Sequence, residues 1–170
     1  MEEPLFLDIQ PQPDDKTCGP TCLHAVYRYY DVEIPLPQVI REVRSLEGGG
    51  TLAVYLGLHA LEHGFKATIL TYNLQVFDPT WFSDGNVRLV DKLSEQTQYK
   101  SGKRFGVASA AYLDFLKHGG RIRFLNLTAG LLRKYLKRRQ PILTGLSATY
   151  LYNCARERAE GDRLVYDDVR

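Results

Sequence analysis

The sequence predicts an α+β fold in which helices come first and strands concentrate later. Segments with apolar residues at helical spacing fill most of the N-terminal half, and alternating β-branched segments become frequent only afterwards. The two kinds of segment do not alternate regularly, and no internal repeat is present. A length of 170 residues suits one core. We therefore expect one domain that spans residues 1–170.

The N-terminal half is predicted to be mainly helical. Its helices are expected at residues 18–30, 36–45 and 51–63. Thr17 is a suitable N-cap for the first helix, and Pro20 lies in its first turn, where a missing N–H costs nothing. Thr51 is the expected cap of the third helix, and Gly64 is its expected stop. An extended segment, residues 4–10, precedes all three helices.

The C-terminal half is predicted to hold most of the strands. Runs of β-branched and apolar residues place strands at 65–72, 121–125, 141–146 and from 163 onward. Further helices are expected at 87–98, 105–117 and 128–138. Residues 141–146 form an apolar run, so we expect them to be a central strand.

Composition excludes several classes of protein. The apolar fraction of 44% and the charged fraction of 25% are ordinary for a globular chain. No apolar run approaches the ~20 residues needed to span a bilayer, and the acidic start of the chain lacks the apolar stretch of a secretory signal. Three cysteines are too few for a disulfide framework, and an odd number of cysteines cannot all form pairs. We expect a cytoplasmic protein without a membrane span.

Positive charge is concentrated in residues 100–139. Eleven Lys and Arg residues lie in this basic segment, with Asp114 as its only acid. The segment is interpreted either as a set of solvated helix faces or as the wall of a groove for an anionic substrate. Nucleic acid is not expected as a partner, because no stacking platform or groove-reading helix accompanies the charge.

Cys18 is the candidate nucleophile because it lies at the predicted start of a helix. The unpaired N–H groups and the macrodipole of a helix N-terminus favour a thiolate there. Gln12, six residues earlier, carries a side-chain amide that can complete an oxyanion hole with the Cys18 N–H. Gly19 is expected to leave space beside the sulfur for a substrate backbone. The carboxylates of Asp14 and Asp15 oppose a thiolate, and the sequence does not decide where they point.

The other cysteines are interpreted as structural. Cys22 follows one turn later, at helical spacing with Val26, and is expected in the core; Cys154 is also taken as structural. Cys18, Cys22 and His24 match no standard zinc-ligand spacing. Neither a metal nor an organic cofactor is predicted.

At these residues the chain resembles the bacteriocin-processing (double-glycine leader) peptidase-like family, a branch of the papain-like cysteine peptidases. The resemblance covers about the first thirty residues, with Gln12 followed by Cys18-Gly19-Pro20-Thr21-Cys22-Leu23 and the aromatic helix end Tyr27-Arg28-Tyr29-Tyr30. It implies a papain-like fold with the nucleophile at the start of the central helix, followed by an antiparallel sheet that is incomplete at the C-terminus here. It also implies that Cys18 is the nucleophile and Gln12 the oxyanion donor.

The catalytic histidine of that family lacks a counterpart at the expected place, on a strand after the sheet begins. The four histidines are His24, His59, His63 and His118, and all precede residues 141–146. His59 and His63, one turn apart, are interpreted as a surface pair or as packing histidines, and His118 as a cation at a helix C-terminus. Three explanations stay open: the base lies beyond Arg170, the protein is a degenerate peptide-binding module, or an existing histidine serves in a rearranged site.

The predicted function is thiol-dependent acyl transfer, with hydrolysis of a peptide bond by a cysteine peptidase as the first choice. The expected partner is a peptide or protein substrate. One alternative is a non-catalytic peptide-binding module. The other is a γ-glutamyl or thiol-peptide transferase related to phytochelatin synthase, whose small anionic peptide substrate would suit the basic segment.

Overall fold

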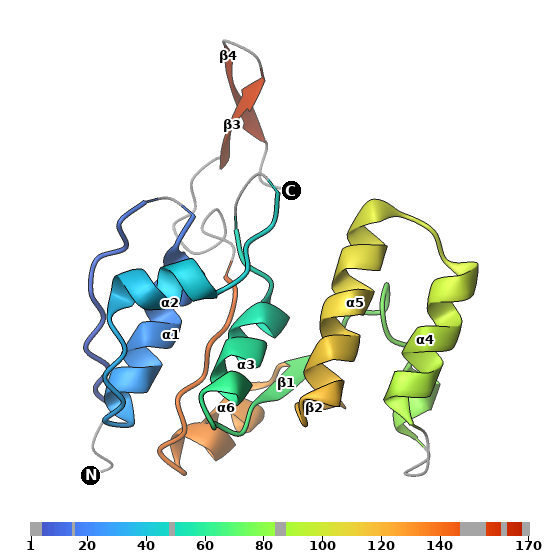
Figure 1. Ribbon diagram of the computed structural model, residues 1–170, viewed down its shortest axis with the longest axis horizontal. Coiled ribbons are helices and arrows are strands. Elements are labelled where there is room, and N and C mark those ends of the chain that lie inside the picture. The colour runs from blue at the N-terminus through green and yellow to red at the C-terminus, as the bar shows by residue number, and fades with distance from the viewer. Residues whose placement is uncertain are drawn as a thin grey trace.

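The computed structural model describes residues 5–14, 16–47, 50–83 and 88–146, together with the backbone of two strands at 156–160 and 163–167. This part of the chain is mixed helix and sheet (Figure 1). Its α-helices are α1 (Cys18–Tyr29), α2 (Leu36–Glu42), α3 (Ala53–Glu62), α4 (Leu89–Tyr99), α5 (Lys103–Lys117) and α6 (Ala129–Leu136). Its strands are β1 (Thr68–Thr71), β2 (Arg121–Phe124), β3 (Arg156–Glu160) and β4 (Arg163–Asp167), and a 3₁₀ helix, η1 (Pro79–Phe82), follows β1.

The three N-terminal helices pack together around one of two buried apolar clusters. Leu23 and Tyr27 of α1 meet Val39 of α2 and Ala60 of α3 in this cluster. Figure 1 shows α1 and α2 side by side, with α3 next to them. The predicted helix positions are confirmed to within a few residues, but the N-cap residue of α3 is Leu52 rather than the expected Thr51. Gly64 follows the end of α3 as expected, in the left-handed conformation with φ of 80°.

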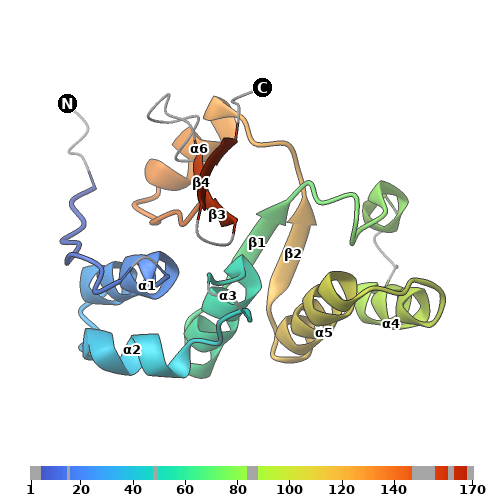
Figure 2. The ribbon, with the colours of Figure 1, turned by 90° about the horizontal axis from the view of Figure 1, so that it is seen from above.

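The second cluster covers one face of a small parallel sheet. β1 and β2 lie side by side (Figure 2), with Thr68 opposite Arg121 and Thr71 opposite Phe124. Helices α3 and α5 pack on this pair. The buried members of the cluster are Val54, Leu58, Val76, Phe77, Leu93, Ala111, Phe115 and Ile122.

The parallel pairing differs from the antiparallel sheet expected after the helices. Between β1 and β2 the chain runs through η1, α4 and α5, which is the kind of long connection that parallel strands require. Antiparallel pairing occurs instead between β3 and β4. The coarse class, mixed helix and sheet, is therefore confirmed, while β1 and β2 run parallel where an antiparallel arrangement was expected.

Residues 141–146 do not form the central strand that their apolar character suggested. They have no strand pairing within the described part of the chain, and residues 143–146 are exposed. Pro141 has no N–H to offer a neighbouring strand, which weakens its case as part of a sheet. Apolar composition alone was a poor guide here, because it does not identify a pairing partner.

Phe115 occupies the centre of the second cluster and depends on two glycines. Its side chain is fully buried. A Cβ atom at Gly120 would lie 2.4 Å from the Phe115 ring, and one at Gly57 would lie 2.8 Å from it. These glycines therefore allow α3 and the start of β2 to approach the ring closely. None of the helices described here is long and apolar enough to cross a membrane.

Candidate functional site

Cys18 is the first residue of α1, as the sequence predicted, and its side chain is exposed. Thr17 is the N-cap residue, but its hydroxyl does not cap the helix; it donates instead to the Asp14 carbonyl at 3.2 Å. A threonine cap normally accepts from an N–H in the first turn, and Pro20 at the third position has none to give. Thr17 therefore does not supply the usual side-chain acceptor at the start of α1.

The backbone N–H of Cys18 finds no acceptor among the residues that the structure describes. A free N–H at a helix start can receive an anion, since the helix dipole also favours negative charge there. Gln12 is exposed on the segment before the helix. Among the described residues, no hydrogen bond joins it to Cys18. The two predicted site residues are thus both accessible, and no bond between described residues joins them directly.

The space beside Gly19 is occupied, which corrects one expectation. A Cβ atom at Gly19 would lie 3.3 Å from Thr51 Cβ and 3.5 Å from Leu56 Cδ1. The glycine thus lets the start of α1 pack closely against the start of α3. It does not provide a channel for a substrate backbone on that side.

Asp14 points back into the turn that precedes α1. Its carboxylate accepts a hydrogen bond from the Lys16 N–H at 2.7 Å. Asp15 lies outside the described residues. The Asp14 carboxylate is therefore hydrogen-bonded to the local backbone. Of the two aspartates whose direction the sequence left open, this one is now placed.

Cys22 and His24 lie further along α1 and have structural environments. Burial raises the pKa of the Cys22 thiol, and the neighbouring Cys18 adds to this effect. His24 is buried, and its Nδ1 has no hydrogen-bond partner among the described residues. Burial lowers the pKa of His24, Arg28 lowers it further, and Asp8 partly opposes them.

His24 does not stand beside Cys18. At 100° and 1.5 Å per residue, six residues place it about 120° around the helix and roughly 9 Å along the axis. No hydrogen bond or ion pair joins any of the four histidines to Cys18, and all four lie in the described part of the chain. The candidate nucleophile therefore has no imidazole partner in this arrangement.

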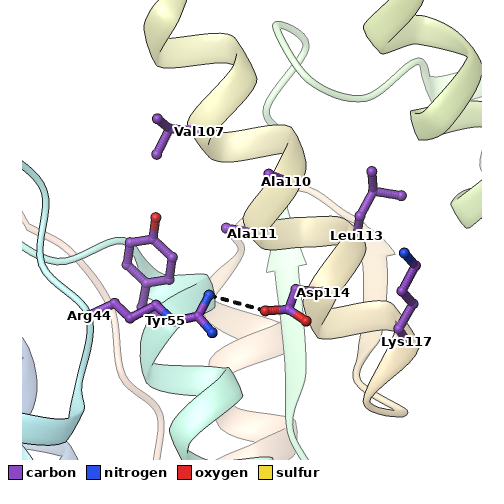
Figure 3. A pocket seen from close by; sticks show the side chains of 8 residues that line it. All are labelled: Arg44, Tyr55, Val107, Ala110, Ala111, Leu113, Asp114 and Lys117. Carbon is purple, nitrogen blue, oxygen red and sulfur yellow. Dashed lines mark hydrogen bonds and ion pairs between the residues drawn. The ribbon is translucent and has the colours of Figure 1, made fainter.

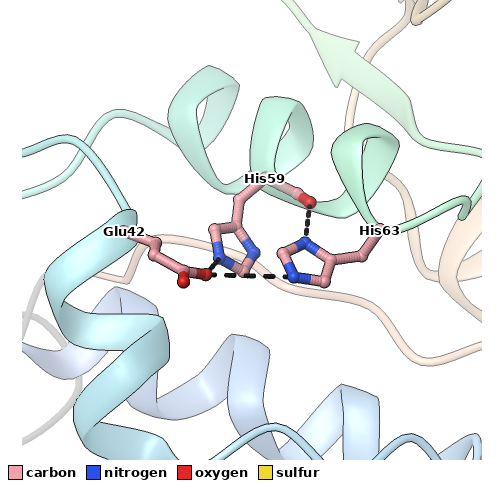
Figure 4. A group of neighbouring side chains, drawn as sticks. All are labelled: Glu42, His59 and His63. Atoms are coloured by element: carbon pink, nitrogen blue, oxygen red, sulfur yellow. Dashed lines mark hydrogen bonds and ion pairs between the residues drawn. The ribbon is translucent and has the colours of Figure 1, made fainter.

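His59 and His63 belong to a polar group that the sequence did not reveal. His59 is buried, with 2% of its side chain exposed, so it is a packing histidine rather than part of a surface pair. Its Nδ1 lies 2.7 Å from the Tyr27 hydroxyl, and its Nε2 lies 3.1 Å from Glu42 Oε2 (Figure 4). Residues offering nitrogen and carboxylate ligands thus gather at one place. The spacing of the histidines could have signalled it, but Glu42 could not be placed from sequence.

Two grooves open beside α5. The smaller, of about 500 Å³, contains the Arg44–Asp114 ion pair, whose atoms lie 3.1 Å apart, and is bordered by Tyr55 (Figure 3). The larger, of about 1210 Å³, is lined in part by Lys103 and Arg104. Neither Cys18 nor Gln12 is among the described residues that line these two grooves.

The basic segment fits both interpretations given to it. All eleven of its Lys and Arg residues are exposed, as solvated faces would be. Lys103 and Arg104 also border the larger groove, and Lys117 borders the smaller one. An anionic ligand in either groove would meet these cations.

Comparison with known proteins adds no assignment. The chain matches no protein-family model, no curated protein and no solved structure. Interpretation of the site therefore depends on the motif around Cys18 and on the geometry described above.

Proposed function

We propose that the protein is a thiol-dependent acyl-transfer enzyme of the papain-like type, in which Cys18 attacks a peptide carbonyl. The observation that carries this proposal is an exposed cysteine at the first residue of α1, with its backbone N–H free of any acceptor in the described residues. Gln12, exposed ahead of the helix, supports the same assignment. The proposed setting is the cytoplasm, and the proposed partner is a peptide or protein.

The reaction begins with a bond between Cys18 Sγ and the carbonyl carbon. The π electrons of the carbonyl move to its oxygen, where the Cys18 N–H and the Gln12 amide donate hydrogen bonds. The Cys18 thiol gives its proton to solvent before the attack. Collapse of the intermediate then breaks the C–N bond, the amine takes a proton from solvent, and a thioester remains on Cys18. Water then attacks the thioester, releases the acid and restores the thiol. An acyl acceptor other than water would make the same site a transferase.

Alkylation by iodoacetamide tests whether Cys18 is a reactive thiol. Mass analysis of digested protein gives a separate rate for each of the three cysteines at a series of pH values. We expect Cys18 to be labelled first, because it is exposed, whereas burial protects Cys22. The Cys18→Ser variant should lose the fast phase, and Cys22→Ser, the matched control, should retain it. Equal and slow labelling of all three cysteines would contradict the proposal.

A non-catalytic peptide-binding module is the second candidate. It is favoured by the observation that none of the four histidines bonds to Cys18 in the described residues. Such a module would bind peptides equally well as the wild type and as Cys18→Ala, without forming a thioester. Fluorescence polarisation with labelled peptides measures the binding, and intact mass detects the adduct.

The γ-glutamyl or thiol-peptide transferase is favoured by a different observation, the pair of exposed cations at the larger groove. Arg104 and Lys103, the latter paired with Glu47 at the same groove, supply positive charge that would attract the carboxylates of a small anionic peptide. Incubation with glutathione should then leave a γ-glutamylcysteinyl group on Cys18, detectable by mass. Charge reversal at Lys103 and Arg104 should weaken this reaction more than acylation by a neutral ester.

A further inference from the structure

Three side chains with metal-binding atoms converge between α2 and α3, in the direction of the C-terminal end of α1. Glu42 is the last residue of α2, His59 lies within α3, and His63 is the C-cap residue of α3 (Figure 4). One ligand atom from each lies within 4.8 Å of the other two. Glu42 Oε2 is 3.1 Å from His59 Nε2 and 3.9 Å from His63 Nε2.

We propose that Glu42, His59 and His63 bind one divalent transition-metal ion, with zinc as the first choice and water completing the coordination. Two imidazoles and one carboxylate are a known zinc-ligand set. Ligand atoms about 2.0–2.2 Å from a tetrahedral ion lie roughly 3.3 Å from one another. The three ligand atoms all lie within 4.8 Å of one another, so no pair needs to shorten by more than about 1.5 Å, which side-chain rotation can supply.

The orientation of His63 is the strongest evidence for this site. Its Nδ1 lies 2.9 Å from the His59 carbonyl. A carbonyl only accepts, so this nitrogen carries the proton, and in the neutral ring Nε2 has a free lone pair. That lone pair lies on the side of Glu42, at 3.9 Å, which is too long for a hydrogen bond. Metal-binding histidines are commonly oriented by just such a bond from the other ring nitrogen.

His59 is held for the same task by Tyr27. The Tyr27 hydroxyl, on a fully buried side chain, lies 2.7 Å from His59 Nδ1. A tyrosine hydroxyl can donate or accept. Without metal it donates to Nδ1 while Nε2–H donates to Glu42; with metal, Nδ1–H donates to the hydroxyl and Nε2 is free to coordinate. Both states give each ring nitrogen of His59 a partner, so the metal can take the place of the proton on Nε2.

A metal-free hydrogen-bond network explains only part of this arrangement. It accounts for Tyr27, His59 and Glu42, which form a continuous chain of short contacts. It gives His63 Nε2 only a long ion pair with Glu42, at 3.9 Å, which requires a protonated ring, although the His63 ring lies against the His59 ring with centroids 4.3 Å apart. A metal ion between the two rings and the carboxylate uses all three side chains.

The site has an open side and is separate from Cys18. The side chains of Glu42 and His63 are 37% and 27% exposed, so an ion can enter between them although His59 is buried. Tyr27 is nine residues after Cys18, or roughly 14 Å along α1. The proposed ion would therefore join α2 to α3 next to α1, and it takes no part in the acyl transfer proposed above.

Cobalt(II) titration of the full chain tests the site directly, because cobalt reports its ligands by colour. We expect one ion per chain, visible d–d bands of a tetrahedral or five-coordinate centre, and no thiolate charge-transfer band. Zinc should displace the cobalt and raise the melting temperature. The absence of a thiolate band separates this site from Cys18 and Cys22.

Variants locate the ligands. His63→Gln and Glu42→Gln should each weaken metal binding by at least about 100-fold, because loss of outer partners alone typically costs 10–100-fold. His118→Gln is the matched control, since His118 Nδ1 also bonds a carbonyl four residues earlier but has no second imidazole beside it. Circular dichroism without metal confirms that each variant is folded. Thiolate bands, unchanged binding in His63→Gln, or no saturable binding to the wild type would each overturn the proposal.

Discussion

Replacement of Tyr27 by phenylalanine removes one oxygen atom from the buried contact between α1 and α3. The ring is fully buried and packs on Phe65, with centroids 5.1 Å apart, and a phenylalanine retains this packing. The lost group is the hydroxyl that lies 2.7 Å from His59 Nδ1. Since His59 is buried as well, its Nδ1 would then have no partner.

The expected cost follows from that orphaned nitrogen. A buried polar group that loses its partner costs about 1–3 kcal/mol, so we expect Tyr27→Phe to lower the free energy of unfolding by about 2 kcal/mol. For a chain of this size the melting temperature should fall by roughly 4–8 °C. The effect should persist in the presence of a chelator, because it does not depend on a bound metal.

Urea denaturation followed by circular dichroism measures the change. The slope of the transition should stay constant, which shows that the fold is retained, while the midpoint shifts. Tyr99→Phe is the control, because Tyr99 is 81% exposed, and its substitution should change stability by less than about 0.5 kcal/mol. A Tyr27→Phe variant as stable as Tyr99→Phe would refute the role given to the hydroxyl.

Two further predictions concern α1 and the core. Burial and then Cys18 raise the pKa of Cys22, so Cys22 should be alkylated only at higher pH than an ordinary thiol, and at ordinary pH once urea unfolds the chain. Because the folded state favours the neutral thiol, the contribution of Cys22 to the free energy of unfolding is fully present below the ordinary pKa of a thiol. It is lost as the pH rises through the raised pKa of Cys22 in the folded state. Gly120→Ala should destabilise by about 1–3 kcal/mol because its Cβ would strike the Phe115 ring, as thermal melts can show. Gly106→Ala, in the interior of α5 with open space around it, should instead stabilise by up to about 1 kcal/mol; the opposite order would contradict the packing described.

The sequence predicted local features, such as where helices begin and end, well. The start of α1 at Cys18 was predicted correctly, although the Thr17 hydroxyl does not cap it, and the end of α3 follows from Gly64, because each depends on the backbone of a few residues. Thr128 caps α6 as expected, since its hydroxyl accepts from the Leu131 N–H at 3.1 Å.

Features that join distant segments were not predictable in the same way. The parallel pairing of β1 with β2 and the unpaired state of residues 141–146 depend on which strands meet, and periodicity does not specify this. The approach of Glu42 to His59 depends on how α2 packs against α3. Likewise, Gly19 was expected to open space for a substrate, yet the start of α3 fills that space.

Acylation of Cys18 by a small activated ester, p-nitrophenyl acetate, tests the central claim most directly. Intact and peptide mass analysis at alkaline pH, where the thiol ionises without an imidazole, measures the rate at which an acetyl thioester forms. We expect the adduct on Cys18, and we expect Gln12→Ala to slow its formation by about 10²–10³-fold while alkylation by iodoacetamide, which forms no oxyanion, keeps its rate. Acetylation that persists in Cys18→Ser, or that is equally fast in Gln12→Ala, would contradict the assignment of Cys18 as nucleophile and Gln12 as oxyanion donor.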